Sequence, residues 1–235
     1  MCPDVGFALE PMPGARYESN AMPPTDPAAL APRPRRFSMI RSFVFADLLT
    51  LGNGFCGAAS VLAAMQFLVM ANGRWLWLAM ALLPIALVFD FADGRVARWR
   101  HRSSFLGADL DSLADVISFG MAPAAIGFAV GLRGAVDVVI LLYFVGCGIS
   151  RLARFNATAD VLADESGKVK YFEGTPIPTS VLIVAVLAVL HARGLIGLNL
   201  WLGAWHLGRF ALHPLSLLYA ISGSAMISTM RVPKI

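Results

Sequence analysis

The sequence predicts an all-α integral membrane protein with six transmembrane helices and with both termini in the cytoplasm. Two observations on composition lead to this fold class. Of the 235 residues, 57% are hydrophobic and only 14% are charged, whereas soluble globular chains carry about 25% charged residues. Long apolar segments also recur along the chain, each near the roughly 20 residues that cross a hydrocarbon core. This composition excludes a disordered chain, a coiled coil and a nucleic-acid-binding module.

The first forty residues differ from the rest of the chain. They form an Ala-rich stretch with many prolines, and basic residues gather at its end and just beyond it, at Arg33, Arg35, Arg36 and Arg41. The stretch lacks the basic start, short apolar core and small-residue cleavage site of a secretory signal peptide. We therefore expect residues 1–40 to form a mobile cytoplasmic tail and residues 41–235 to form one six-helix domain.

Six apolar segments follow this tail. In chain order they cover about residues 45–70, 75–97, 111–131, 135–152, 177–191 and 212–230. Because lipid offers no water to satisfy backbone polar groups, these segments should be helices rather than strands. The stretch that contains Trp201, Trp205, His206 and Arg209 is too polar to span a membrane, and we interpret it as an interfacial segment.

The placement of basic residues predicts the orientation. The tail, the second-to-third loop, the fourth-to-fifth loop and the C-terminus together hold 15 of the 19 lysines and arginines. The opposite side holds the other four, Arg74, Arg133, Arg193 and Arg209. By the positive-inside rule, both termini face the cytoplasm. An even number of spans agrees with this, because it returns the chain to its starting side.

Four aspartates stand at the meeting point of the second and third segments. Asp90 and Asp93 are three residues apart, and Asp111 and Asp115 are four apart, so each pair shares one helical face. A charged residue at the centre of a membrane helix costs about 2.5–3.5 kcal/mol even on lenient insertion scales. The short loop between the segments favours antiparallel neighbours whose acidic faces meet.

Four carboxylates held close together at neutral pH repel each other unless some are protonated or a cation lies among them. Oxygen ligands suit Mg²⁺ or Mn²⁺ better than zinc, and Mg²⁺ is often shared between carboxylates and substrate phosphates. Arg98 adds a fixed positive charge suited to phosphate, and Gly94 leaves space for a ligand. The pattern indicates a metal and phosphate site at the cytoplasmic membrane surface.

Some of these features also have simpler interpretations. A single buried aspartate paired with an arginine often only packs a membrane bundle, and Asp109 is adequately explained as a solvated charge at a helix start. Packing does not explain four aspartates at two helical spacings with a basic loop between them. Gly52, Gly54 and Gly57 either allow close helix approach near the site or are generic small residues of a membrane interface.

The aspartate motif resembles the signature of the CDP-alcohol phosphatidyltransferase family. Asp90-Phe-Ala-Asp93-Gly94-Arg-Val-Ala97-Arg98, eight further residues and Gly107-Ala-Asp-Leu-Asp111-Ser-Leu-Ala-Asp115 match it at eight fixed positions over 26 residues. The resemblance implies a six-helix membrane enzyme, usually a homodimer, that transfers a phosphatidyl group from a CDP-linked lipid to an alcohol and releases CMP. It also implies a multi-pass protein of the cell (inner) membrane with its active site at the cytoplasmic face.

Further motifs resemble the branch of the family that uses L-serine as acceptor and CDP-diacylglycerol as donor. They are Thr50-Leu-Gly-Asn53-Gly-Phe-Cys-Gly57, Asp111 to Pro123, Arg151-Leu-Ala-Arg154-Phe-Asn156 and Phe172-Glu-Gly174-Thr-Pro176-Ile-Pro178. Sister enzymes with choline, inositol or glycerol 3-phosphate as acceptor remain an alternative. A cation-coupled transporter is a more remote one, because it has no use for the spacing of Gly94, Arg98 and Gly107.

The resemblance assigns a role to each matching residue. Asp90, Asp93 and Asp111 would bind divalent metal ions, Mg²⁺ or Mn²⁺, and Asp115 would contribute to the second metal and act as general base. The pocket for the nucleotide and diphosphate would be lined by Thr50, Asn53, Gly94, Arg98 and Ser104.

The acceptor site is expected at the cytoplasmic end of the fourth segment. There Arg151 and Arg154, followed by Asn156, would receive the serine carboxylate and leave the serine hydroxyl toward Asp115. Basic residues at this position also serve the positive-inside rule and bind anionic lipid headgroups, so an anchoring role stays open for the two arginines.

Overall fold

The computed structural model describes residues 45–100, 107–162, 172–173, 175–197, 200–207, 210–228 and 231–232. The predicted tail, residues 1–40, lies outside these ranges. The described part is mainly helical, as predicted, and two short two-stranded sheets accompany the helices. The sequence did not predict these sheets.

Four helical stretches are long and apolar enough to cross a membrane. They are Asp47–Met70, Gly73–Val96, Gly107–Val130 and Ala135–Ala157. They correspond to the first four predicted spans, so the chain is a multi-pass membrane protein. The predicted fifth and sixth spans correspond to the shorter apolar helices Ile177–Ala192 and Pro214–Ile227. Six spans and the orientation of the termini therefore stay predictions.

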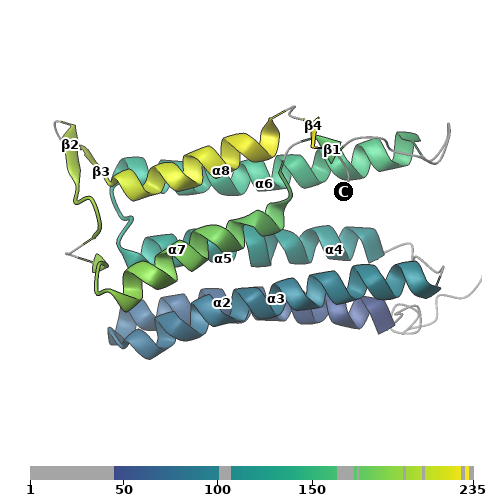
Figure 1. The fold of residues 1–235 in the computed structure, drawn as a ribbon, viewed down its shortest axis with the longest axis horizontal. Helices are drawn as coiled ribbons and strands as arrows, with labels where there is room; N and C mark the ends of the chain where they lie inside the picture. Colours follow the sequence, from purple (N-terminus) through teal and green to yellow (C-terminus); the bar gives the residue numbers. More distant parts are fainter. Residues whose placement is uncertain are drawn as a thin grey trace, which may run out of the picture. The chain divides into compact units, whose positions relative to one another are not determined.

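The first two helices, α2 (Phe45–Met70) and α3 (Gly73–Arg100), form an antiparallel hairpin along their whole length. Figure 1 shows them side by side. The turn between them is short, with Ala71 in the left-handed conformation at φ 51°. Ser60 on α2 is fully buried and donates a hydrogen bond of 2.7 Å to the carbonyl of Ala79 on α3.

The third predicted span is one continuous helical rod with a change of geometry in its middle. It consists of α4 (Gly107–Asp115), a π-helical turn η2 (Val116–Met121) and α5 (Ala122–Val130). In the π turn the N–H of Ala122 donates to the carbonyl of Ile117, five residues earlier. Pro123 follows directly and has no N–H for a regular α-helical hydrogen bond, which favours a locally wider turn.

The fourth helix, α6 (Ala135–Leu162), is longer than its predicted span of residues 135–152. It continues far enough to carry Arg151, Arg154 and Asn156 on a regular helix. At its start the Asp137 side chain is fully buried. It accepts hydrogen bonds from the N–H of Gly134 at 3.0 Å and from the N–H of His213 at 2.9 Å.

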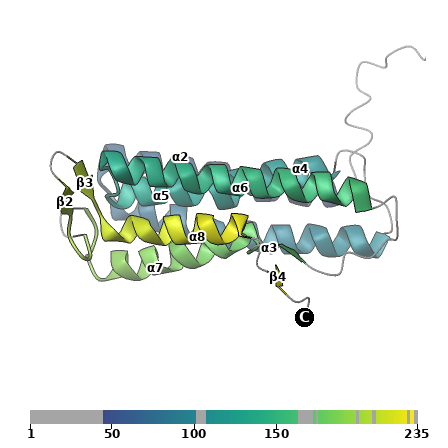
Figure 2. The same ribbon diagram turned by 90° about the horizontal axis from the view of Figure 1, so that it is seen from above.

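The last two helices are shorter and pack on the first four. A 3-10 turn η3 (Ile177–Thr179) leads into α7 (Ser180–Ala192), and a 3-10 turn η5 (Pro214–Ser216) leads into α8 (Leu217–Ile227). Figures 1 and 2 show α8 beside α6, and the two helices are in contact. The predicted start of the sixth span at Leu212 is too early, because Leu212 belongs to a strand and the helical turns begin at Pro214.

The predicted interfacial segment contains a β-hairpin. Strands β2 (Trp205–Leu207) and β3 (Phe210–Leu212) pair antiparallel, with Trp205 opposite Leu212. Trp201 and Trp205 are exposed, which suits the boundary between lipid and water. A second small sheet pairs β1 (Phe172–Glu173) with β4 (Arg231–Val232).

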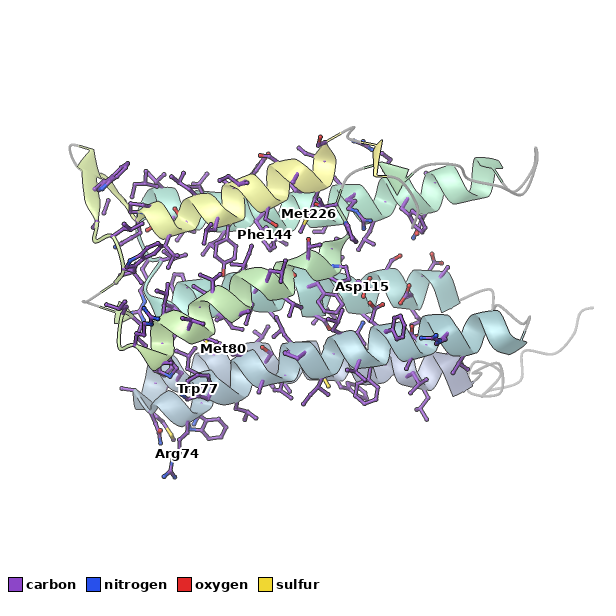
Figure 3. All side chains as sticks on the ribbon, in the orientation of Figure 1. Arg74, Trp77, Met80, Asp115, Phe144 and Met226 are labelled. Carbon is purple, nitrogen blue, oxygen red and sulfur yellow. The ribbon has the colours of Figure 1, made fainter. Side chains whose placement is uncertain are left out.

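The core runs along the inside of the helix bundle. Figure 3 labels Met80, Phe144 and Met226, all of them buried. Tyr219 of α8 is fully buried against Phe144, and its hydroxyl donates a 2.8 Å hydrogen bond to the carbonyl of Pro123. This hydrogen bond ties α8 to the helix that carries Asp115, just after the π turn.

Candidate active site

Two helices bring the predicted metal-binding aspartates together. Asp90 and Asp93 lie in the second half of α3, and Asp111 lies in α4. Each offers a carboxylate oxygen that lies within 4.8 Å of those of the other two. The antiparallel arrangement predicted from the short loop accounts for this meeting, because Asp90 and Asp93 lie toward the C-terminal end of α3 and Asp111 lies near the start of the next helix.

The composition of this group suits a hard divalent cation. All of its donor atoms are carboxylate oxygens, and such sets favour Mg²⁺ or Mn²⁺. In addition, Asp111 Oδ1 is buried and has no hydrogen-bond partner among the described residues. An unpaired buried carboxylate oxygen is costly, so a cation at this point would compensate both its desolvation and the repulsion between the three charges.

Asp115 lies one helical turn beyond Asp111 and is not a member of the three-aspartate group among the described residues. It is buried, and Figure 3 shows its position near the end of α4. The charges of Asp90, Asp111 and Asp93 act on it. The structure thus separates one carboxylate slightly from the three that best fit a metal.

Two polar side chains of α2 hold the aspartates in place. Thr50 donates a hydrogen bond from Oγ1 to Oδ2 of Asp93 over 2.8 Å, and Asn53 donates one from Nδ2 to Oδ1 of Asp115 over 3.1 Å. Both donors are buried. The prediction that Thr50 and Asn53 line the nucleotide pocket stays a prediction, whereas their hydrogen bonds to Asp93 and Asp115 are features that sequence reasoning missed.

The π turn packs closely against α2 beside these contacts. Ser118 is fully buried and donates a hydrogen bond of 2.9 Å to the carbonyl oxygen of Asn53. A Cβ added at Gly57 would lie 2.6 Å from Cα of Ser118, closer than real Cβ atoms come. Of the two interpretations of this glycine, close helix approach is the one that the structure supports.

The predicted acceptor residues on α6 fall into different environments. Arg151 is half-buried, its Nε has no hydrogen-bond partner among the described residues, and its charge interacts with that of Asp115. Arg154 is exposed. The two arginines thus differ more than their three-residue spacing suggested.

Asn156, the third predicted acceptor residue, contacts α4. Its Nδ2 donates a hydrogen bond of 2.9 Å to the hydroxyl of Ser112, which itself donates to the carbonyl of Ala108 over 3.0 Å. This contact joins α6 to the helix that carries Asp111 and Asp115. Ser112 lies between the two aspartates in the sequence, yet no residue pattern indicated that it pairs with Asn156.

The remaining predicted site residues are Gly94, Arg98 and Ser104. An added Cβ at Gly94 would meet no atom of the described residues within 4 Å, so their packing alone does not require a glycine there. This agrees with the expected space for a ligand. Arg98 lies in α3, but its side chain falls outside the described part of the chain, as does Ser104 altogether.

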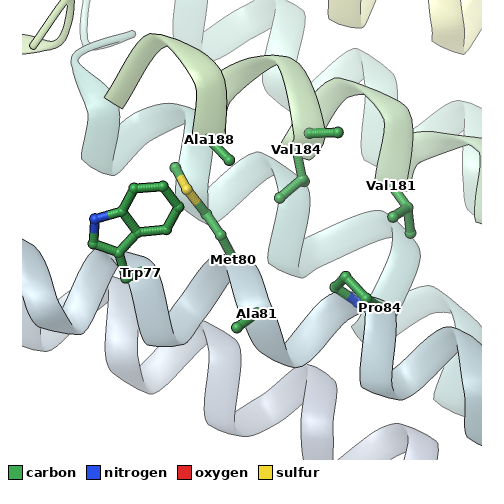
Figure 4. Close-up of a pocket in the computed structure, with 8 residues that line it drawn as sticks. Trp77, Met80, Ala81, Pro84, Val181, Val184 and Ala188 are labelled. Carbon is green, nitrogen blue, oxygen red and sulfur yellow. The ribbon is translucent and has the colours of Figure 1, made fainter. Parts of the chain in front are cut away.

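An apolar pocket also lies between α3 and α7 (Figure 4). Its volume is about 330 Å³, and its lining includes Met80, Pro84 and Val184. No carboxylate of the described residues lines it, so this pocket differs in chemistry from the aspartate site.

Comparison with known proteins identifies the family. The family model described as CDP-alcohol phosphatidyltransferase matches residues 43–212. The chain is 40% identical over 240 aligned residues to a CDP-diacylglycerol–serine O-phosphatidyltransferase of Saccharomyces cerevisiae, covering 98% of this chain and 87% of that protein.

Bacterial proteins with the same printed name are also similar. The relative from Mycobacterium leprae is 30% identical over 202 residues, which cover 86% of this chain and 61% of that protein. The relative from Bacillus subtilis is 31% identical over 159 residues, which cover 65% of this chain and 82% of that protein. Since the family model matches well over half of the residues and includes all four aspartates, the chain belongs to the CDP-alcohol phosphatidyltransferase family.

Proposed function

We propose that the protein transfers a phosphatidyl group from CDP-diacylglycerol to the hydroxyl of L-serine, giving phosphatidylserine and CMP. The observation that carries the proposal is the convergence of Asp90, Asp93 and Asp111 on one point, with Asp115 one helical turn beyond Asp111 on the same helix. The names of the relatives from Saccharomyces cerevisiae and Mycobacterium leprae support serine as the acceptor.

Asp90, Asp93 and Asp111 would hold the divalent cation, Mg²⁺ or Mn²⁺, and Asp115 would contribute to a second one. When bound, the metal ions neutralise the diphosphate of the donor lipid and the charge that develops on departing CMP. The chain positions its own carboxylates for this task through Thr50, which fixes one oxygen of Asp93. Gly94 and Arg98 would lie along the diphosphate, with Ser104, Thr50 and Asn53 contributing to the nucleotide pocket.

Asp115 would act as the general base. A serine hydroxyl is a weak nucleophile until a base removes its proton as attack develops. The serine oxygen forms a bond to the phosphorus of the phosphatidyl group, the bond from that phosphorus to the oxygen of CMP breaks, and the serine proton passes to Asp115. Because Asn53 occupies Oδ1 of Asp115, the second carboxylate oxygen can take the proton.

Arg151 would bind the carboxylate of the acceptor. Its guanidinium is half-buried near Asp115, and its Nε lacks a partner among the described residues, so it can pair with an incoming anion. An acceptor held there presents its hydroxyl toward Asp115. Arg154 and Asn156 would complete the acceptor site, with Asn156 also holding α6 against Ser112.

The placement in the cell is part of the same proposal. The predicted cytoplasmic segments hold 15 of the 19 basic residues, and the aspartates lie at the ends of α3 and α4 next to one of those segments. We therefore place the site at the cytoplasmic face of the inner membrane, where water-soluble serine meets the lipid donor. The homodimer that the family resemblance implies can be tested by native mass spectrometry of the detergent-solubilised protein.

The decisive experiment is an acceptor screen. The purified full chain is supplied with CDP-diacylglycerol and Mg²⁺ or Mn²⁺, and CMP release is measured with L-serine, choline, inositol or glycerol 3-phosphate. We expect serine-dependent release of CMP and formation of phosphatidylserine. Turnover with another alcohol and none with serine would refute the choice of acceptor while leaving the family chemistry intact.

A further inference from the structure

The hydrogen bonds around Asn53 form a clamp between α2 and the helix that carries the proposed base. The Asn53 side chain donates to Asp115 over 3.1 Å, and the Asn53 backbone carbonyl accepts from the hydroxyl of Ser118 over 2.9 Å. Asn53 and Ser118 are fully buried, and Asp115 is 8% exposed. Asn53 is thus held through both its side chain and its backbone by two residues that lie three apart on the neighbouring helix.

The hydrogen bond of Ser118 runs to a neighbouring helix, as that of Ser60 does, and not along its own helix. Serines in helices often donate to the carbonyl four residues earlier in their own helix. Ser112 does so toward Ala108 at 3.0 Å, and Ser224 toward Ala220 at 2.8 Å. Ser118 instead donates across the interface to α2, so its hydroxyl serves the contact between helices.

Two local features permit this crossing. Ser118 lies in the π turn, where the wider helix changes the direction of the side chains that follow Asp115. Gly57, one turn after Asn53 on α2, has no side chain to keep the backbone of Ser118 away. The π turn begins directly after the proposed base Asp115, and Gly57 contacts Ser118 within that turn. Neither feature is needed for a simple apolar contact between helices.

We propose that Ser118 is a positioning residue for catalysis. Its hydroxyl fixes Asn53, and Asn53 in turn fixes the Asp115 carboxylate in the orientation that accepts the proton of the acceptor alcohol. The inference rests on the proposed function, because it takes Asp115 as the base. Displacement of a catalytic group by about 1 Å can cost about 100-fold in rate, so a contact that does not touch substrate can still control turnover.

The test compares three variants of the full-length protein in detergent with saturating Mg²⁺. Ser118→Ala removes the hydroxyl, and Ser118→Cys keeps the shape of the side chain but replaces the hydroxyl with a somewhat larger thiol that is a weak donor. The matched control is Ser60→Ala, since Ser60 is also a fully buried serine that donates to a carbonyl of a neighbouring helix, at 2.7 Å to Ala79. Thermal unfolding is measured for each variant alongside kinetics.

We expect both Ser118 variants to lower kcat by about tenfold, with KM for serine and for CDP-diacylglycerol changed less than about threefold, because orientation rather than binding is lost. Ser60→Ala should keep kcat, even where its unfolding temperature falls as far as that of Ser118→Ala. Wild-type kcat in Ser118→Ala, or full recovery of kcat in Ser118→Cys, would overturn the proposal and leave Ser118 as a packing residue.

A double-mutant cycle then checks the route of the effect. If Ser118 acts through Asn53, adding Ser118→Ala to Asn53→Ala should lower kcat less than about twofold further, because the link is already broken. If the kcat losses of Ser118→Ala and Asn53→Ala instead multiply in the double variant, Ser118 does not act through Asn53. Failure of the proposed function would look different: the wild type would show no serine-dependent CMP release, or Asp115→Asn would retain turnover.

Discussion

Thr50 of α2 donates a hydrogen bond from its Oγ1 to Oδ2 of Asp93 on α3, over 2.8 Å and in a buried position. Asp93 belongs to the group of three aspartates whose oxygens converge. A hydrogen bond from a neighbouring residue orients a metal-binding carboxylate without touching the metal. The first helix of the bundle therefore takes part in the site, although it contributes no carboxylate to the group.

This relationship predicts an effect on metal dependence. Thr50→Val removes the hydroxyl at nearly constant volume and should raise the Mg²⁺ or Mn²⁺ concentration needed for half-maximal activity by about tenfold, the low end of losses for such orienting residues. Thr50→Ser keeps the donor and should stay near wild type. The half-maximal metal concentration of both variants is measured by removing metal with a chelator and then titrating activity with Mg²⁺ or Mn²⁺. An unchanged metal requirement in Thr50→Val would show that the hydrogen bond does not orient a metal ligand.

A second prediction concerns Asp115. Asp115→Asn keeps the shape of the side chain and removes the base, so turnover should fall by about 10³-fold, within the range of general-base contributions. Binding of CDP-diacylglycerol, and of metal at Asp90, Asp93 and Asp111, should stay largely intact. The matched control is Asp109→Asn, because Asp109 lies on the same short helix but is exposed. Near-normal turnover of Asp115→Asn would refute the assignment of the base.

The third prediction separates the two arginines of α6. Arg151 is half-buried and interacts with Asp115, whereas Arg154 is exposed. Loss of a charged hydrogen-bond partner typically costs about 1.5–3 kcal/mol, so Arg151→Ala should raise KM for serine by about 10- to 100-fold with little change for CDP-diacylglycerol. Arg154→Ala should have a smaller effect. Initial rates measured while the concentrations of serine and of CDP-diacylglycerol are varied give the two KM values. Equal changes in both KM values would point to an anchoring role.

The sequence predicted the helical fold and the aspartate cluster for a physical reason. Charge is rare in a membrane chain, so the positions of Asp90, Asp93, Asp111 and Asp115 carry much information, and regular helical spacing suffices to place each pair on one face. The convergence of Asp90, Asp93 and Asp111 confirms the expected meeting of these helices.

Other parts of the site depend on contacts between helices that local spacing does not determine. The pairing of Asn156 with Ser112, and of Ser118 with the carbonyl of Asn53, requires the rotation and depth of each helix in the bundle. The π turn likewise lies just before Pro123 and where α2 and α8 contact this helix, and an apolar periodicity gives no sign of it. The β2–β3 hairpin was missed because a short polar stretch with two tryptophans fits an interfacial helix and a hairpin equally well.

The last prediction concerns two glycines with opposite environments. A Cβ at Gly57 would lie 2.6 Å from Cα of Ser118, whereas a Cβ at Gly94 would meet nothing within 4 Å in the part of the chain that the structure describes. Gly57→Ala should therefore destabilise the protein by about 1–3 kcal/mol, the usual cost of overpacking, and lower its unfolding temperature. Gly54→Ala is its control, because the nearest contact of the added Cβ would be an ordinary 3.5 Å to Cβ of Ala114.

Gly94→Ala should leave the unfolding temperature unchanged and lower kcat/KM for CDP-diacylglycerol, because the methyl group would occupy space that the diphosphate needs. Thermal unfolding in detergent and CMP release together test both, and a Gly94→Ala variant with wild-type kinetics would show that the open space beside this glycine does not receive the donor lipid.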